Sequence, residues 1–250
     1  HFLTWSILDK AYIYNGTDAI KLYDGTTFST LTGTNIPVAR GMAPILDRLL
    51  AITANGIERT SPRVDNVWSA NSSWATFRPS LVGLFTAIHP HTLDTGNGLL
   101  PGVIAFQPNA FYMITGTDFG SDASALAASA GEDASITLLD SRVGTSSPYS
   151  VVSVPGLGLF WFTSDLNVFF LPYGATSGRY IGDKLRSTVT TPGIESLNTA
   201  AINQVWMAYH NRYLRLAIPT GSNTYPTTEF WLDLRSLVEH QDRGFVWYGP

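Results

Sequence analysis

The feature that most constrains the fold of this chain is residues 150–174, SVVSVPGLGLFWFTSDLNVFFLPYG, which hold two short apolar runs. Residues 157–162 and 167–171 flank the polar tripeptide Thr163-Ser164-Asp165. Aromatic and β-branched residues suit a pleated strand, and the polar residues between the runs can close a hairpin. Because the runs are almost continuously apolar, we expect a β-hairpin that is largely buried on both faces.

Similar hairpins recur along the chain. Residues 46–52 resemble residues 210–218, and residues 102–116 resemble residues 153–174, with a glycine, an aromatic strand, a short turn and a second aromatic strand. The four starts lie about 50 to 58 residues apart. A period close to this, with about four strands in each repeat, is typical of β-propeller blades.

The sequence therefore predicts an all-β protein, a β-propeller of about five four-stranded blades that forms a single domain over residues 1–250. A β-sandwich or jelly roll is the alternative. Turn signals such as Asn15-Gly16 and Asp24-Gly25 separate short strand-like segments within the expected blades. The expected blades cover residues 1–32, 40–88, 100–142, 150–190 and 200–250.

Four segments have specific local expectations. Residues 123–130 hold good helix formers and predict a short helix or a mobile loop, whereas residues 89–99 read as a polar loop. Residues 179–190 carry apolar side chains at four-residue spacing and could form one amphipathic helix. Residues 200–208 have strand character.

Composition narrows the functional classes. Charged residues make up 14% of the chain, well below the usual share of about 25%, which favours β-rich proteins packed into assemblies. The net charge is −4 without a cluster of Lys and Arg, so sequence-specific nucleic-acid binding is not expected. The absence of cysteine excludes disulfides, a thiol nucleophile and cysteine-based metal sites.

The chain has no apolar run long enough to predict a membrane span. It begins HFLTWSILDK, without an initiator methionine or the features of a signal peptide. These strand-like first residues predict that the chain is part of a longer or processed polypeptide.

Candidate chemistry is sparse. His89-Pro90-His91 is the only local pair among five histidines, and an H-x-H pair in a strand, with Asp94, could begin a metal site. Because Pro90 favours a loop, a solvated loop is preferred. Gly156-Leu157-Gly158 lacks the third glycine of a dinucleotide-binding loop and is interpreted as a turn into a hairpin.

Carboxylates and tryptophans are the residues that could act on or bind a carbohydrate. Two carboxylates at a propeller channel could form a glycosidase site, although aspartates at turns commonly cap backbone amides instead. The candidates for that site are Asp47, Asp65, Asp140, Asp165 and Asp233. The seven tryptophans could stack on sugars, but their even spacing favours packing between blades; they are Trp5, Trp68, Trp74, Trp161, Trp206, Trp231 and Trp247. We therefore predict no enzyme, no catalytic, metal or cofactor-binding residues, and no cofactor.

Several short segments resemble bacteriophage tail proteins with a β-propeller, of the tail nozzle or tail tubular type. The main ones are YMITGTD at 112–118, VGTSSPYSVV at 143–152, GLFWFTSD at 158–165 and IGDKL at 181–185. Weaker similarity lies at 47–49, 67–69, 209–219 and 228–235. Together they span most of residues 40–250, but Leu166-Asn167 stands where the family usually has a Gly-Val turn.

The resemblance implies a structural protein of the virion tail, such as a nozzle, tail-tube or adaptor component, that forms a ring of identical subunits. Its implied partners are other copies of itself and neighbouring tail proteins, and DNA could pass through the assembled channel. The resemblance supplies no catalytic residues. The alternative function is a carbohydrate-binding or glycosidase-type propeller for receptor recognition.

Overall fold

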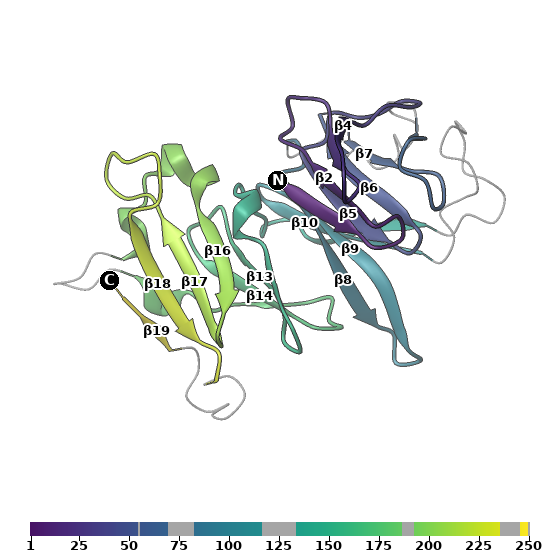
Figure 1. Cartoon of the computed structure of the whole chain (residues 1–250). Helices are drawn as coiled ribbons and strands as arrows, with labels where there is room; N and C mark the ends of the chain where they lie inside the picture. Colours follow the sequence, from purple (N-terminus) through teal and green to yellow (C-terminus); the bar gives the residue numbers. More distant parts are fainter. Residues whose placement is uncertain (55, 70–82, 117–133, 187–192, 236–245, 250) are drawn as a thin grey trace. The chain divides into compact units, whose positions relative to one another are not determined.

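The computed structural model describes residues 1–54, 56–69, 83–116, 134–186, 193–235 and 246–249 (Figure 1). The chain divides into two compact units, residues 1–141 and residues 142–250. Regular structure in the described residues consists mainly of antiparallel β-strands with a few short 3-10 helices. The all-β fold class predicted from the sequence is therefore confirmed.

The first unit contains three sheets. The first sheet is made of β1 (Phe2–Trp5), β2 (Lys10–Ile13), β3 (Lys21–Tyr23) and β4 (Phe28–Thr30). The second is made of β5 (Gly41–Ile45), β6 (Arg48–Thr53) and β7 (Gly56–Arg59). The third is made of β8 (Ala87–Asp94), β9 (Leu99–Gln107), β10 (Ala110–Thr115) and β11 (Ser135–Asp140).

The second unit contains two sheets. The fourth sheet is made of β12 (Val152–Val154), β13 (Gly158–Phe162), β14 (Val168–Pro172) and β15 (Arg179–Tyr180). The fifth is made of β16 (Trp206–His210), β17 (Tyr213–Ile218), β18 (Thr228–Asp233) and β19 (Trp247–Tyr248). The 3-10 helices among the described residues are η2 (Pro148–Ser150), η3 (Asp183–Leu185), η4 (Ile194–Ser196) and η5 (Thr199–Gln204).

Every described sheet keeps its strands in sequence order, with each strand paired to the next. Such up-and-down sheets lack the crossovers that a jelly roll requires. The five sheets follow the residue ranges of the five expected blades, with two corrections. The second sheet has three strands among the described residues instead of the expected four. β8, which the sequence interpretation divided between the end of the second blade and a polar loop, pairs with β9 over eight positions and belongs to the third sheet.

The hairpin at residues 150–174 forms as predicted. β13 and β14 pair in register, with Phe160 opposite Phe170 and Trp161 opposite Phe169. The ring centroids of these two pairs lie 4.4 Å and 4.8 Å apart. All four side chains are buried, and because neighbours in a strand point to opposite faces, both faces of the hairpin are covered.

Apolar side chains between successive sheets form the core of each unit. One cluster, which includes Tyr12, Leu49 and Trp68, joins the first sheet to the second. Another joins the second sheet to the third. In the second unit, Phe160 and Phe170 of the fourth sheet pack with Leu214, Leu216 and Phe230 of the fifth. Each sheet thus buries one face against its neighbour, as adjacent propeller blades do.

Two local expectations are wrong. Residues 179–180 form strand β15, paired with Phe169 and Phe170, and residues 183–185 form one 3-10 turn, so no amphipathic helix begins at Arg179. Residues 199–204 are 3-10 helix, and strand structure starts only at Trp206. The expected helix or loop at 123–130 lies outside the described residues, as do Trp74 and His240.

Candidate functional site

The candidate carboxylates lie on different sheets and contact different side chains. Asp47 lies 3.9 Å from Arg48 and 3.8 Å from Arg63, Asp165 accepts a hydrogen bond from the Tyr180 hydroxyl at 2.9 Å, and Asp140 ends β11. Asp65 and Asp233 each accept several hydrogen bonds, which are described below. The contacts given for Asp47, Asp65, Asp165 and Asp233 are therefore separate from one another.

Asp65 anchors the first sheet to the segment that follows the second. Its carboxylate accepts hydrogen bonds from the Tyr12 hydroxyl at 2.9 Å and from the Lys10 ammonium at 2.8 Å. Its backbone carbonyl accepts the Trp68 indole N–H at 2.7 Å. Burial, reinforced by the charge of Asp65, raises the pKa of Tyr12 far above its ordinary value. This geometry makes Asp65 a structural residue.

The Tyr12 contact predicts a loss of stability in alkali. A raised pKa in the folded state means that the stabilisation is complete below the ordinary tyrosine pKa of about 10 and is lost progressively at higher pH. Burial also raises the pKa of Tyr14 and Tyr112, which act in the same direction. We expect the free energy of unfolding from urea titrations to fall above about pH 10.

Tyr12→Phe should reduce this alkaline slope and cost about 1 kcal/mol at neutral pH through the lost hydrogen bond. The matched control is Tyr225→Phe, because Tyr225 is exposed in the loop between β17 and β18. An alkaline slope that is unchanged in Tyr12→Phe would contradict the role assigned to the contact.

The His89-Pro90-His91 segment is part of strand β8, which corrects the expected loop. His89 and His91 lie on the same face of the strand, but Asp94 follows at odd spacing and its carboxylate accepts the Gly96 amide at 2.8 Å. Burial lowers the pKa of His89. In the described part of the chain, no three His, Asp or Glu residues are arranged to hold a metal ion.

The first sheet leaves one face uncovered. Tyr12, Leu3 and Leu22 point into the core, so their neighbours in each strand point the other way. That second face is defined by Phe2, Ile13, Tyr23 and Phe28 with Lys21 among them, and we call it the N-face. Phe2 is 68% exposed and Phe28 is 63% exposed.

The fifth sheet also has a partly exposed face, which is aromatic and carries an ion pair. Arg215 lies over the ring of Trp231 at 4.6 Å and near that of Trp206 at 6.0 Å, and its guanidinium forms an ion pair with Glu229. Tyr248 pairs in register with Trp231 and is exposed. These five residues define what we call the C-face.

Some tryptophans are buried and others lie on an exposed face. Trp5 and Trp68 are buried in the cluster between the first and second sheets, which agrees with the expected packing between sheets. Trp161 is also buried, where it contacts Phe169 of the same sheet. Trp231 is 38% exposed on the C-face, so the expectation of uniform core packing is wrong for this residue. Even spacing of tryptophans along the chain could not identify the face that each side chain would occupy.

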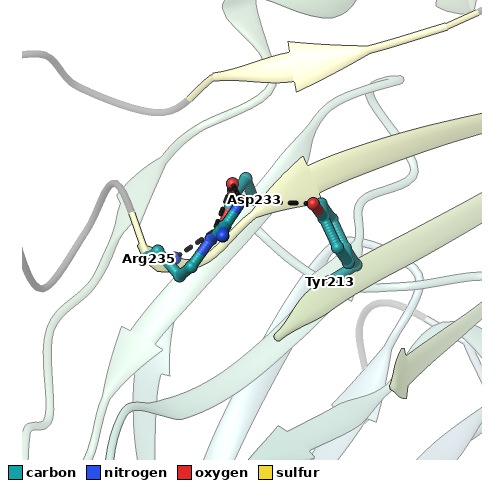
Figure 2. A network of polar contacts seen from close by, with 3 residues as sticks. All are labelled: Tyr213, Asp233 and Arg235. Atoms are coloured by element: carbon teal, nitrogen blue, oxygen red, sulfur yellow. Dashed lines mark hydrogen bonds and ion pairs between the residues drawn. The ribbon is translucent and has the colours of Figure 1, made fainter. Parts of the chain in front are cut away.

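A polar network closes one end of the fifth sheet (Figure 2). Asp233 accepts hydrogen bonds from the backbone and guanidinium of Arg235, and Arg235 also donates to the Tyr213 hydroxyl at 3.2 Å. The guanidinium beside Asp233 holds the pKa of that carboxyl below its ordinary value. The sequence interpretation included Asp233 as a possible catalytic acid but missed Arg235, although the i,i+2 spacing in Asp233-Leu234-Arg235 was visible.

No protein-family model matches this chain, and no curated protein matches it. Among solved structures, the chain is similar to the AfRom2 CNH domain, with 9% identity, 93% of this chain and 67% of that chain covered, and a TM-score of 0.42. It is also similar to the computationally designed protein Ika8, with 10% identity, coverage of 93% and 70%, and a TM-score of 0.38. At this level of similarity, neither structure bears on the function of this chain.

Among the described residues, no helix has the length and apolar character needed to cross a membrane.

Proposed function

We propose that this chain is a non-enzymatic structural component of a bacteriophage tail, such as a nozzle, tube or adaptor protein, and that its five sheets are β-propeller blades of which the first and the fifth each keep one face for contact with another subunit. In this proposal, its partners are further copies of itself and neighbouring tail proteins. The supporting observation is the pair of exposed or partly exposed faces on the first and fifth sheets. The short sequence similarities to phage tail propellers point in the same direction.

The N-face resembles the covered faces of the sheets in composition. Elsewhere in each unit, sheet faces with large apolar side chains are buried against the next sheet. On the N-face, Phe2, Ile13 and Phe28 are at least 40% exposed. Contiguous apolar surface of this kind marks interaction sites in soluble proteins. Assembly would bury these side chains as the sheets within each unit already do.

The N-face and the C-face differ in composition, so contact between them would be heterologous. The N-face is mainly aliphatic and phenyl, whereas the C-face combines indole rings with an Arg–Glu pair. Contact between unlike faces of identical subunits is heterologous, and it produces a ring when the rotation between subunits closes. A ring of identical subunits is the form that the resemblance to phage tail proteins implies.

We expect Phe28→Glu to weaken self-association at least tenfold, because a carboxylate placed in an apolar interface loses its hydration. Sedimentation velocity of the wild type should show discrete oligomers, and the variant should shift toward the monomer. The matched control is Tyr225→Glu, because Tyr225 is equally exposed, at 63%, but lies in a loop outside both faces.

A wild-type chain that stays monomeric at all accessible concentrations would refute the assembly proposal. If Phe28→Glu and the wild type sediment equally, the N-face is not an interface of the assembly. Electron microscopy of virions that contain the chain would then place it among its neighbours.

A glycan-binding function is the second candidate, and the exposed C-face favours it. Trp231 and Tyr248 lie side by side in register, and adjacent exposed rings can stack on sugars. Glycan-array binding that disappears in Trp231→Ala, together with unchanged sedimentation, would favour this function over assembly. Loss of oligomers without any glycan signal would favour assembly.

A further inference from the structure

A hollow of about 410 Å³ lies in the second unit, where two β-turns and the end of β18 meet. One turn connects β12 to β13 and the other connects β16 to β17. The volume is within the range of small-molecule sites. The lining residues that carry the argument are Pro155, Leu157, Tyr209, Arg212, Leu234 and Arg235.

Local hydrogen bonds hold both turns in place. In the first turn, the Leu157 amide donates to the Val154 carbonyl at 3.1 Å around Pro155-Gly156, and Gly156 has a φ of 76°. The second turn is tied to the end of β18 because the Leu234 amide donates to the Arg212 carbonyl at 2.9 Å. The walls of the hollow are therefore preorganised parts of the fold.

Arg212 has an unusual backbone conformation for its residue type. Asn211 and Arg212 have φ angles of 47° and 72° and form the two central positions of the tight turn between β16 and β17. Glycine is preferred at the second such position because any side chain strains the left-handed conformation. Residues held in this region cluster at functional sites. An arginine at this position costs stability but directs a guanidinium to the hollow.

Among the residues that the structure describes, the charges around the hollow sum to one positive charge. Arg212 and Arg235 both line it, and none of the lining residues is acidic. Asp233 is hydrogen-bonded to the Arg235 guanidinium and also interacts electrostatically with Arg212, so its charge offsets one of the two cations. In the part of the chain that the structure describes, no carboxylate forms a salt bridge with Arg212. A ligand with one negative charge would neutralise this net positive charge, whereas a ligand with two negative charges would leave the occupied site negative.

The rest of the lining is apolar and aromatic. Pro155, Leu157 and Leu234 provide apolar surface, and Tyr209 adds a ring and a hydroxyl group. We propose that this hollow binds a small organic acid through one carboxylate, held by Arg212 and Arg235, with a compact ring seated against the apolar wall. The site is separate from the N-face and does not depend on the proposed role in a phage tail.

The test measures binding of two carboxylate probes to the full chain by isothermal titration calorimetry. Benzoate and D-glucuronate each combine one carboxylate with a ring, and benzamide and D-glucose are their neutral counterparts. We expect at least one acid to bind, and its neutral counterpart to bind at least tenfold more weakly. Arg212→Gly should weaken binding of that acid at least tenfold while raising the thermal midpoint, because glycine relieves the turn.

Arg63→Gly is the matched control, because Arg63 has a similar φ of 56°, is largely exposed and lies in the first unit. It should leave binding unchanged. The proposal is overturned if neither acid binds, if the neutral probes bind equally well, or if Arg212→Gly retains wild-type affinity. Tighter binding of inorganic phosphate than of either acid would overturn the assignment of a singly charged ligand.

Discussion

Replacing Phe160 with alanine is expected to lower the free energy of unfolding of the second unit by about 3–5 kcal/mol. Phe160 is fully buried in the core between the fourth and fifth sheets and stacks on Phe170 at 4.4 Å. Truncation removes its apolar contacts and leaves a cavity that rigid β-sheets cannot close. Urea titrations followed by circular dichroism would measure the loss.

Phe28→Ala is the control for this prediction because it makes the same substitution in another strand. Phe28 is 63% exposed, so its replacement should change the stability of the isolated chain by less than about 1 kcal/mol. Similar losses in both variants would show that the core between the fourth and fifth sheets is not the main source of stability. A Phe160→Ala protein with wild-type stability would contradict the packing of these sheets.

The second large effect is expected for Gly158→Ala, with a loss of about 2–4 kcal/mol. Gly158 starts β13 with a φ of 144°, a conformation that strains any other residue. A Cβ atom there would lie 2.2 Å from the Leu171 carbonyl oxygen and 2.7 Å from the Tyr173 amide nitrogen. Both are backbone atoms of the paired segment, so the strands would have to separate.

Gly156→Ala separates this clash from simple backbone strain. Gly156 has a φ of 76°, but an added Cβ would have no atom within 4 Å. Its replacement should therefore cost only about 1 kcal/mol, the cost of a left-handed alanine. Thermal unfolding monitored by circular dichroism would compare the two variants. Equal losses at the two positions would refute the close approach of β13 and β14.

The positions of the sheets were largely predictable because their signals are local. Asn15-Gly16 and Asp24-Gly25 end short strand-like runs, and the first sheet follows these turns. Residues 46–52 and 210–218, whose similarity was visible, both contain the tight turn between the first two strands of a sheet and the second strand. Turn chemistry and apolar runs depend on neighbouring residues, so the sequence alone reveals them.

Errors occurred where pairing with a neighbouring strand overrides the preference of a segment's own residues. Pro90 suggested a loop, yet β8 is the edge strand of the third sheet, where a missing amide hydrogen is tolerated. The apolar spacing over residues 179–190 suggested a helix, but Arg179 and Tyr180 pair with β14 instead. Pro90 pairs with Val103, 13 residues further along the chain, and Arg179 pairs with Phe170, nine residues before it, so the local pattern of each segment does not include its partner.

By itself, the sequence determined the all-β class, the approximate boundaries of the five sheets and the buried hairpin at residues 150–174. Only the tertiary structure decided which sheet faces remain open, because a Phe or Trp in a strand looks the same whether or not a sheet covers it. It also decided that Arg212 and Arg235 line one hollow with Pro155 and Leu157. Residues so far apart in the chain meet only when the fourth and fifth sheets pack through their shared core.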